Sequence, residues 1–242
     1  MGADTGRAPL RLVRLRRVGE RDLAVLHPAL AAAYVRTVAA VAPAIETSLS
    51  DAVIANRVLA ASVDPPVLRL RPFARERTAF RRGLRTLAEQ RRWLLHTDVR
   101  ACFPSIGPGS VGAELRALGC DAASTDEVVA MLERLHGLGV RGLPVGPDAS
   151  AVVANVVLAP ADRAIEASGH RHLRWVDDLV IAVRGPADAV PVLRRVRDAL
   201  AEVGLRLNEA KTRLVPPSSP VDEAVVVSLR SGTRGPQRRV AT

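Results

Sequence analysis

Aromatic residues are scarce in this sequence: three Phe, two Trp and one Tyr make up 2% of its 242 residues. Lysine is scarcer still, because Lys211 is the only lysine among 35 basic residues. The two cysteines, Cys102 and Cys120, have neither the spacing of a zinc site nor the number that a disulfide framework needs. The small number of cysteines predicts a protein of a reducing compartment, the cytoplasm, that depends on its apolar core for stability.

Long apolar runs are also missing. The longest apolar stretch, residues 30–45, is interrupted by Tyr34, Arg36, Thr37 and Pro43. It therefore predicts a helix of a soluble protein and excludes a signal peptide or a membrane span.

Arginine and aliphatic residues are abundant instead. An apolar content of 48% excludes a disordered chain, and the formal net charge is +10. A basic surface attracts polyanions, of which nucleic acid is the commonest. The alternative is an arginine-biased composition that serves no partner.

Residues 93–215 predict an α+β domain. Apolar runs predict strands at residues 93–99 and 205–207, a hairpin at 173–183 and a strand at 212–215. Helices are expected at residues 110–119, 124–136, 148–158 and 186–203, with a Ser124–Glu127 capping box at the second and Pro160 ending or kinking the third. This alternation is typical of a ferredoxin-like antiparallel sheet with helices on one face.

The flanking segments are basic. Residues 1–92 predict a mostly helical region: a loose arm at 1–22, helices at 28–42, 50–58 and 73–92, and a strand at 67–71, with Pro43 ending the first helix. The arginines of the third helix either follow a phosphate backbone or form a solvated face. Residues 216–242 predict a linker and a basic tail.

Two adjacent acids, Asp177 and Asp178, stand between apolar runs. Acids are common in solvent-facing turns, so an ordinary hairpin turn is one interpretation. The other is a metal site, because buried carboxylates need a compensating cation. Asp98 ends the strand at 93–99, and placing that strand beside the hairpin brings three carboxylates to one sheet edge. Such a cluster suits two Mg²⁺ ions, with Mn²⁺ as a substitute.

Four segments, in order, resemble the reverse transcriptase family. They are Asp98 with Phe103-Pro104-Ser105-Ile106, Gly142-Leu143-Pro144-Val145-Gly146-Pro147 with Ser150, Trp175-Val176-Asp177-Asp178, and Gly204-Leu205-Arg206-Leu207-Asn208 with Lys211. Each is weak alone, and together they cover about half of the chain. The first two most resemble bacterial defence-associated and abortive-infection reverse transcriptases.

The resemblance implies a fold and a set of roles. Residues 93–215 would be the palm and residues 1–92 a fingers-like region, with too few residues after 215 for a full thumb, which an oligomer or a partner chain would supply. Asp98, Val99, Asp177 and Asp178 would hold the metal ions, and Lys211 would donate a proton to the departing pyrophosphate. Phe103 would exclude a 2′-hydroxyl, and Gly142, Pro144, Gly146 and Ser150 would lie along the nucleotide and template.

The sequence departs from the family pattern at two positions, and it is compatible with three functions. Trp175 replaces the usual tyrosine, and Val145 replaces the glutamine of many retroviral and retron enzymes. The first hypothesis is a metal-dependent polymerase that adds deoxynucleotides to a 3′ end, templated by RNA or without a template, in antiviral defence. The second is a catalytically inactive palm-like scaffold that binds nucleic acid. A nucleotide cyclase is a third, and it would lack the Phe-Pro-Ser-Ile and Gly-Leu-Pro segments. His96 is expected to be a structural histidine.

Overall fold

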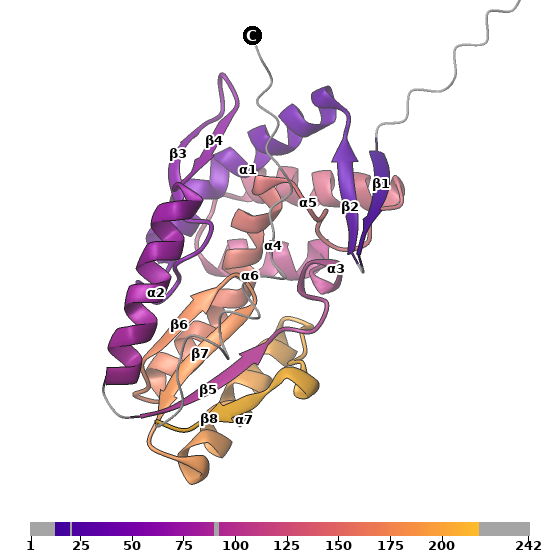
Figure 1. Cartoon of the computed structure of the whole chain (residues 1–242). Helices are drawn as coiled ribbons and strands as arrows, with labels where there is room; N and C mark the ends of the chain where they lie inside the picture. The colour runs from indigo at the N-terminus through magenta and orange to yellow at the C-terminus, as the bar shows by residue number, and fades with distance from the viewer. Residues whose placement is uncertain (1–12, 20, 90–91, 218–242) are drawn as a thin grey trace, which may run out of the picture.

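The computed structural model describes residues 13–19, 21–89 and 92–217 (Figure 1). The strands of this part are β1 (Val13–Val18), β2 (Arg21–Leu26), β3 (Val58–Ser62), β4 (Val67–Leu70), β5 (Trp93–Asp98), β6 (His172–Trp175), β7 (Asp178–Val183) and β8 (Arg213–Val215). The helices are α1 (Pro28–Ser48), α2 (Phe73–Glu89), α3 (Cys102–Ser105), α4 (Pro108–Ala117), α5 (Ala122–Gly137), α6 (Asp148–Ala167), α7 (Pro186–Glu202) and the 3-10 turn η1 (Glu209–Lys211). The described chain is therefore an α+β protein, as predicted.

The four-stranded sheet has the order β6-β7-β5-β8, and every neighbouring pair is antiparallel. Apart from α3, α4 and α5, which are inserted after β5, and the turn η1 before β8, the chain runs β5, α6, β6, β7, α7, β8, which is the β-α-β-β-α-β series of a ferredoxin-like sheet. The predicted strand at 93–99 and the hairpin at 173–183 are confirmed. The order places β5 in the interior of the sheet, directly beside β7.

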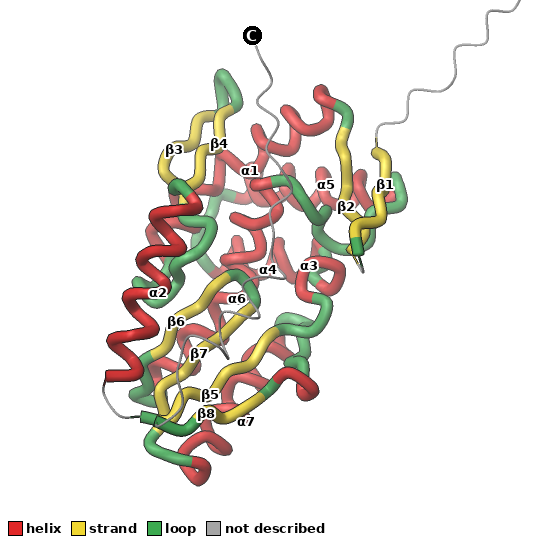
Figure 2. Tube along the Cα trace, viewed as in Figure 1, coloured by secondary structure: helices red, strands yellow, loops and turns green. Residues whose placement is uncertain are grey.

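The two helices that connect the strands of this sheet, α6 and α7, lie on one face, as predicted, and α2, from the segment before β5, covers the other face. Leu95, Leu179 and Ile181 face the main core with α6 and α7. Leu94 and Val180, which point to the other face, pack with Phe80, Leu84 and Leu87 of α2. The central strands are apolar on both sides, so each side needs a cover. Figure 2 shows α2 alongside β6, with α6 and α7 behind the strands.

Helix α1 is the central helix of the N-terminal half. Tyr34, Val38 and Ile45 are fully buried in the main core, where α1 packs against α5 and α6. Its length and composition would also suit a membrane span, although it is a core helix here. The prediction that Pro43 ends this helix is wrong, because the helix continues to Ser48 and buries one more apolar turn.

Other predictions in the flanking segments also need correction. Residues 13–18, 21 and 22, expected to be part of a loose arm, belong to the antiparallel pair of β1 and β2. Residues 50–58, expected to be helical, run without a helix beside β6, where Val53 pairs with Arg174. Residues 205–207 form only a single bridge, between Leu207 and Val99. The arm at 1–12 and the tail from 218 onward lie outside the described residues.

The predicted helices of the C-terminal half are all present, with two changes at their ends. Asp121, and not Ser124, caps α5, since its carboxylate accepts a hydrogen bond from the Ser124 backbone N–H. Helix α6 passes through Pro160 and ends at Ala167, because Ala161 and Ile165 remain buried beyond the proline.

Candidate active site

Asp98 and Asp178 are direct partners across the antiparallel pair of β5 and β7. Asp98 is the last residue of β5 and Asp178 the first of β7, so both side chains lie at the same end of the sheet and on the same face. Asp177 immediately precedes Asp178 in the tight turn between β6 and β7, and its carbonyl accepts a hydrogen bond of 3.2 Å from the Val99 backbone N–H. The structure therefore brings the three predicted aspartates together.

Lys211 lies in η1, just before β8, and so approaches the cluster from the side of β5 opposite to β7. Its Nζ donates a hydrogen bond of 2.6 Å to Asp98 Oδ2, and the backbone N–H of Asn208 donates to the Asp98 carbonyl at 2.8 Å, which ties the lysine turn to the end of β5. The hydrogen bond with Asp98, supported by the negative charges of Asp178 and Asp177, raises the pKa of Lys211. A neutral lysine is therefore disfavoured, and the side chain is held as a cation beside the carboxylates.

The chemistry of this cluster suits a hard cation. Asp98 is buried, and its Oδ1 atom has no hydrogen-bond partner among the described residues. A buried carboxylate oxygen without a partner is costly, and Mg²⁺ and Mn²⁺ prefer oxygen ligands. In the described part of the chain, no group of three or more His, Cys, Asp or Glu side chains is already arranged so that it could hold a metal ion. Asp98 and Asp178 are the preformed pair, with Asp177 and Val99 next to them in sequence.

His96 is a neighbour of the cluster whose contacts were not predicted. It is buried on the same face of β5 as Asp98, and its Nε2 lies 3.5 Å from Asp178 Oδ1. Arg213 of β8 donates from Nε to His96 Nδ1 at 3.3 Å, and His96 Nε2 is a buried atom with no hydrogen-bond partner among the described residues. The sequence indicated this position only through the spacing of two residues between His96 and Asp98.

The predicted nucleotide-binding segments meet beside the cluster. Phe103 lies in α3 and is half-buried against the main core. Its carbonyl accepts a hydrogen bond of 2.8 Å from the Leu143 backbone N–H, and Gly142 stands directly against it. The two segments therefore form one unit, with the Phe103 turn and the Gly142 loop fixed to each other.

The rest of the glycine loop lies against the N-terminal hairpin. The Val145 carbonyl accepts a hydrogen bond of 2.8 Å from Ala24 of β2. Gly146 is exposed with a φ of 125°, whereas Pro144 is buried. Ser150 is fully buried and shares a hydrogen bond of 3.1 Å with the Tyr34 hydroxyl, so in this structure it joins α6 to α1 and does not face solvent.

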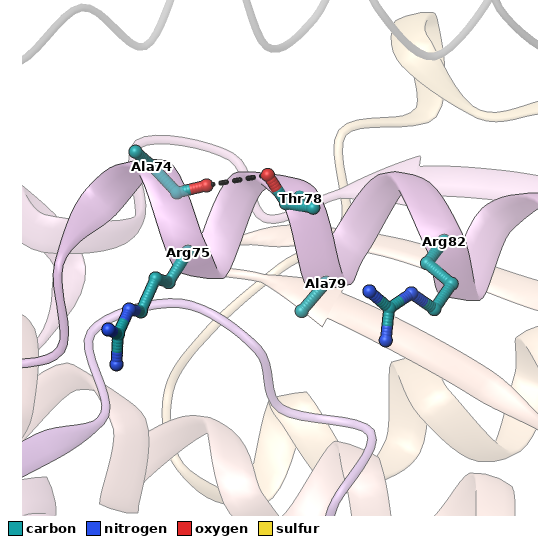
Figure 3. Close-up of a pocket in the computed structure, with 5 residues that line it drawn as sticks. All are labelled: Ala74, Arg75, Thr78, Ala79 and Arg82. Atoms are coloured by element: carbon teal, nitrogen blue, oxygen red, sulfur yellow. Dashed lines mark hydrogen bonds between the residues drawn. The ribbon is translucent and has the colours of Figure 1, made fainter.

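Helix α2 presents a row of arginines to solvent, namely Arg75, Arg81, Arg82 and Arg85. Arg75 and Arg82 flank a shallow hollow lined by Ala74, Thr78 and Ala79 (Figure 3). The opposite side of α2 packs on Trp175, whose ring centroid lies 5.6 Å from that of Phe73 and 5.4 Å from that of Phe80. Since Trp175 pairs directly with Asp178, the basic helix stands on the same sheet face as the carboxylates.

Comparison with known proteins agrees with this geometry. A search among curated proteins found no match. A family model described as reverse transcriptase (RNA-dependent DNA polymerase) matches residues 46–222, which is well over half of the chain and includes every residue of the carboxylate cluster. The chain therefore belongs to the reverse transcriptase family of RNA-dependent DNA polymerases.

Proposed function

We propose that Asp98, Asp177 and Asp178 form the metal-binding active site at which this chain extends a 3′ end with deoxynucleotides. The observation that carries the proposal is the direct pairing of Asp98 with Asp178, with Asp177 in the adjoining turn. These carboxylates would hold divalent ions, which would supply the positive charge that stabilises the attacking and leaving oxygens in a phosphoryl transfer. Val99 adjoins Asp98 and is assigned to the same ion-binding group.

Each neighbouring residue is assigned one role. Lys211, a cation held 2.6 Å from Asp98, is positioned to neutralise and protonate the departing pyrophosphate. Phe103 presents a ring that leaves no room for a ribose 2′-hydroxyl. Gly146, which is exposed, lets the backbone of its loop approach a base or sugar closely, whereas Gly142 is buried against the Phe103 carbonyl and fixes the loop in place. Ser150 is omitted from the proposed site because it is buried against Tyr34.

The arginine row on α2 is proposed to contact the phosphate backbone of the template or primer. It lies on the sheet face that carries the carboxylates, and its partner surface would be a polyanion. In this arrangement residues 93–215 act as the palm, and residues 1–92 act as a fingers-like region that holds nucleic acid above it.

The biological setting is proposed from the resemblance of short segments. The Phe103-Pro104-Ser105-Ile106 turn and the aliphatic Val145 support a placement among defence-associated reverse transcriptases, with an antiviral role. Cys102 and Cys120 are both free thiols, which supports a cytoplasmic location. The acceptor is then a nucleic acid primer or a protein hydroxyl, and the template is RNA or none.

Incorporation of labelled deoxynucleotides by the purified chain tests the proposal. Reactions with Mg²⁺, with Mn²⁺ and with a chelator are compared, each with and without an RNA template. Asp177→Ala and Asp178→Ala should abolish incorporation, whereas Asp126→Ala, at an exposed ion pair with Arg116, should not. If the chain binds nucleic acid equally well with and without chelator and incorporates no nucleotide under any of these conditions, it is a binding scaffold and the active site is rejected.

A further inference from the structure

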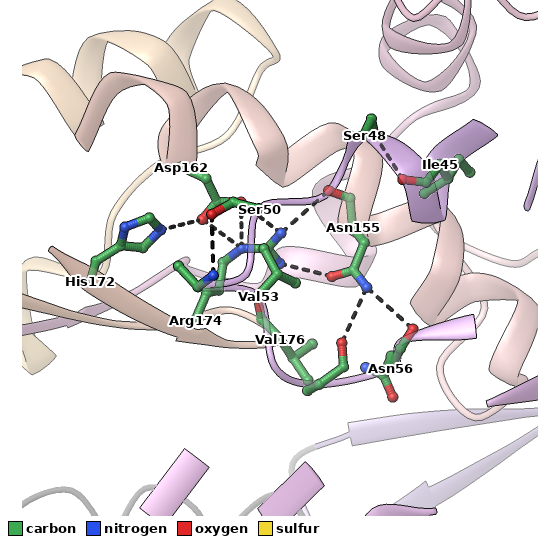
Figure 4. Close-up of polar contacts among 12 residues, drawn as sticks. Ile45, Ser48, Ser50, Val53, Asn56, Asn155, Asp162, His172, Arg174 and Val176 are labelled. Carbon is green, nitrogen blue, oxygen red and sulfur yellow. Dashed lines mark hydrogen bonds and ion pairs between the residues drawn. The ribbon is translucent and has the colours of Figure 1, made fainter. Parts of the chain in front are cut away.

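Strand β6 carries a fully buried cation, Arg174, two residues before Val176 in the aspartate turn. Its Nε donates hydrogen bonds of 3.0 and 2.9 Å to the two carboxylate oxygens of Asp162, and its Nη2 lies 2.8 Å from Asp162 Oδ2. Asp162 is itself buried on α6 and is also 3.0 Å from His172 Nε2. Figure 4 shows these side chains converging between α6 and β6.

The other arm of the guanidinium reaches the turn. Arg174 Nη1 donates to the Asn155 side-chain oxygen at 2.8 Å and to the backbone carbonyl of Val176 at 3.0 Å. Val176 is the residue immediately before Asp177, and it has a φ of 57°. A β-branched residue rarely adopts this left-handed conformation, so surrounding contacts must hold it in place.

Asn155 connects the same arginine to the N-terminal half of the chain. Its side-chain nitrogen donates to the carbonyl of Ala55 at 3.2 Å and lies 3.4 Å from that of Asn56. The backbone of Arg174 also pairs with this segment, since its N–H donates to Ala52 and its carbonyl accepts from Ile54. Arg174 is therefore fixed on three sides, and its guanidinium reaches the aspartate turn through the Val176 carbonyl.

Burial of an ion pair does not by itself explain this arrangement. A well-packed apolar pair often replaces a buried salt bridge without loss of stability, so stability alone does not require arginine here. The forked guanidinium can hold a carboxylate, an amide and a turn carbonyl at the same time, which neither an apolar residue nor lysine can do.

We propose that Arg174 is a positioning residue for the active site, acting through the Val176 carbonyl to hold the turn that presents Asp177 and Asp178. The inference rests on the proposed metal site and deepens it, because it names what orients two of the carboxylates. Asp162 and Asn155 in turn orient Arg174. Arg174 would act by fixing the position of the turn, and it would itself touch neither substrate nor metal.

The test compares Arg174→Lys with Arg57→Lys. Lysine at 174 keeps a positive charge for Asp162 and loses the fork that reaches Val176. Arg57 is a second buried arginine, which bonds Glu46 and the carbonyls of Ser50 and Val53 and does not contact the turn. Both variants should unfold at a lower temperature. Only Arg174→Lys should also weaken Mn²⁺ binding and lower kcat, each by about 10- to 100-fold, while KM for the deoxynucleotide changes little.

A rescue experiment separates positioning from general damage. Glycine adopts the left-handed conformation without steric strain, so Arg174→Lys/Val176→Gly should recover part of the lost Mn²⁺ affinity and kcat. If Arg174→Lys does not fold, Asn155→Ser removes the neighbouring acceptor, keeps the Arg174–Asp162 pair, and should shift Mn²⁺ affinity in the same direction by severalfold.

Two results would overturn the inference. One is wild-type Mn²⁺ affinity and kcat in Arg174→Lys despite reduced stability, and the other is the same loss of Mn²⁺ affinity in Arg57→Lys. Failure of the proposed function looks different, because the wild-type chain would then incorporate no nucleotide. Mn²⁺ binding, measured by water-proton relaxation, would still report whether Arg174 orients the carboxylates.

Discussion

A side-chain carbon on Gly142 would lie 2.4 Å from the backbone carbonyl oxygen of Phe103. Gly142 also has a φ of 63°, so it combines a left-handed backbone with a contact too close for any side chain. Two segments that are distant in the chain are thereby held together at the backbone level, and the Phe103 ring is positioned by the Gly142 loop.

Gly142→Ala is therefore expected to be more damaging than a similar change at a nearby glycine. Gly139 has a φ of 89°, and a side-chain carbon added there would meet no atom within 4 Å, so Gly139→Ala carries the backbone strain alone, about 1–2 kcal/mol. Gly142→Ala should lower the free energy of unfolding by clearly more, as measured by denaturant titration. Equal losses in the two variants would mean that the Phe103–Gly142 contact is not tight.

Substitution of Phe103 should change the choice of sugar. Phe103→Ala removes the ring proposed to exclude the 2′-hydroxyl, so the ratio of kcat/KM for deoxynucleotides to that for ribonucleotides should fall by about tenfold or more. Phe103→Tyr keeps the ring and serves as the control. An unchanged ratio in Phe103→Ala would show that the half-buried ring serves only the core.

Lys211 offers a test of proton transfer. Lys211→Arg keeps a cation beside Asp98, but arginine does not release its proton, so kcat should fall by about a hundredfold, almost as far as in Lys211→Ala. Single-turnover incorporation measures this loss without interference from product release. Full activity in Lys211→Arg would limit the lysine to an electrostatic role.

Acid stability should depend on Asp188 at the start of α7. Hydrogen bonds from the Arg184 guanidinium and backbone N–H hold the pKa of the Asp188 carboxyl well below its usual range. A lowered folded-state pKa stabilises the fold above the unfolded value of about 4, and this contribution is lost as the pH falls through the folded pKa.

Asp188→Asn should accordingly lower the melting temperature at pH 7 and have progressively less effect as the pH falls below about 4. Asp126→Asn is the control, because its ion pair with Arg116 is exposed on both sides and should contribute little at any pH. A difference between wild type and Asp188→Asn that does not shrink in acid would contradict the assignment.

The parts of the fold that were predictable are those with a clear apolar pattern. The strands at 93–99 and 173–183 are largely apolar runs that are buried along most of their length, and the helix at 186–203 repeats apolar residues at helical spacing. The prolines misled the prediction, because burial beyond Pro43 and Pro160 outweighs one missing backbone hydrogen bond. Strand β1 is rich in arginine and exposed at every residue after Val13, so its sequence has no burial pattern that distinguishes a hairpin from a loose arm.

Only some residues of the candidate active site were predictable from the sequence. Residue type and the flanking apolar runs located the three aspartates, the family resemblance pointed to Lys211, and the structure brings the four residues together. Arg174 and His96 carry no such pattern, since their importance depends on which strand and helix lie beside them. Only the pairing of β6 with β7, and the packing of α6 behind them, shows that Arg174 reaches the Val176 carbonyl.

The aromatic cluster around Trp175 gives the protein an intrinsic fluorescent probe. Trp175 touches α2 through Phe73 and Phe80 and is the strand partner of Asp178, and the only other indole belongs to Trp93. In a Trp93→Phe background, any movement of the basic helix relative to the aspartates would change the fluorescence of a single emitter. Nucleic acid or nucleotide capture could then be followed in real time without a label.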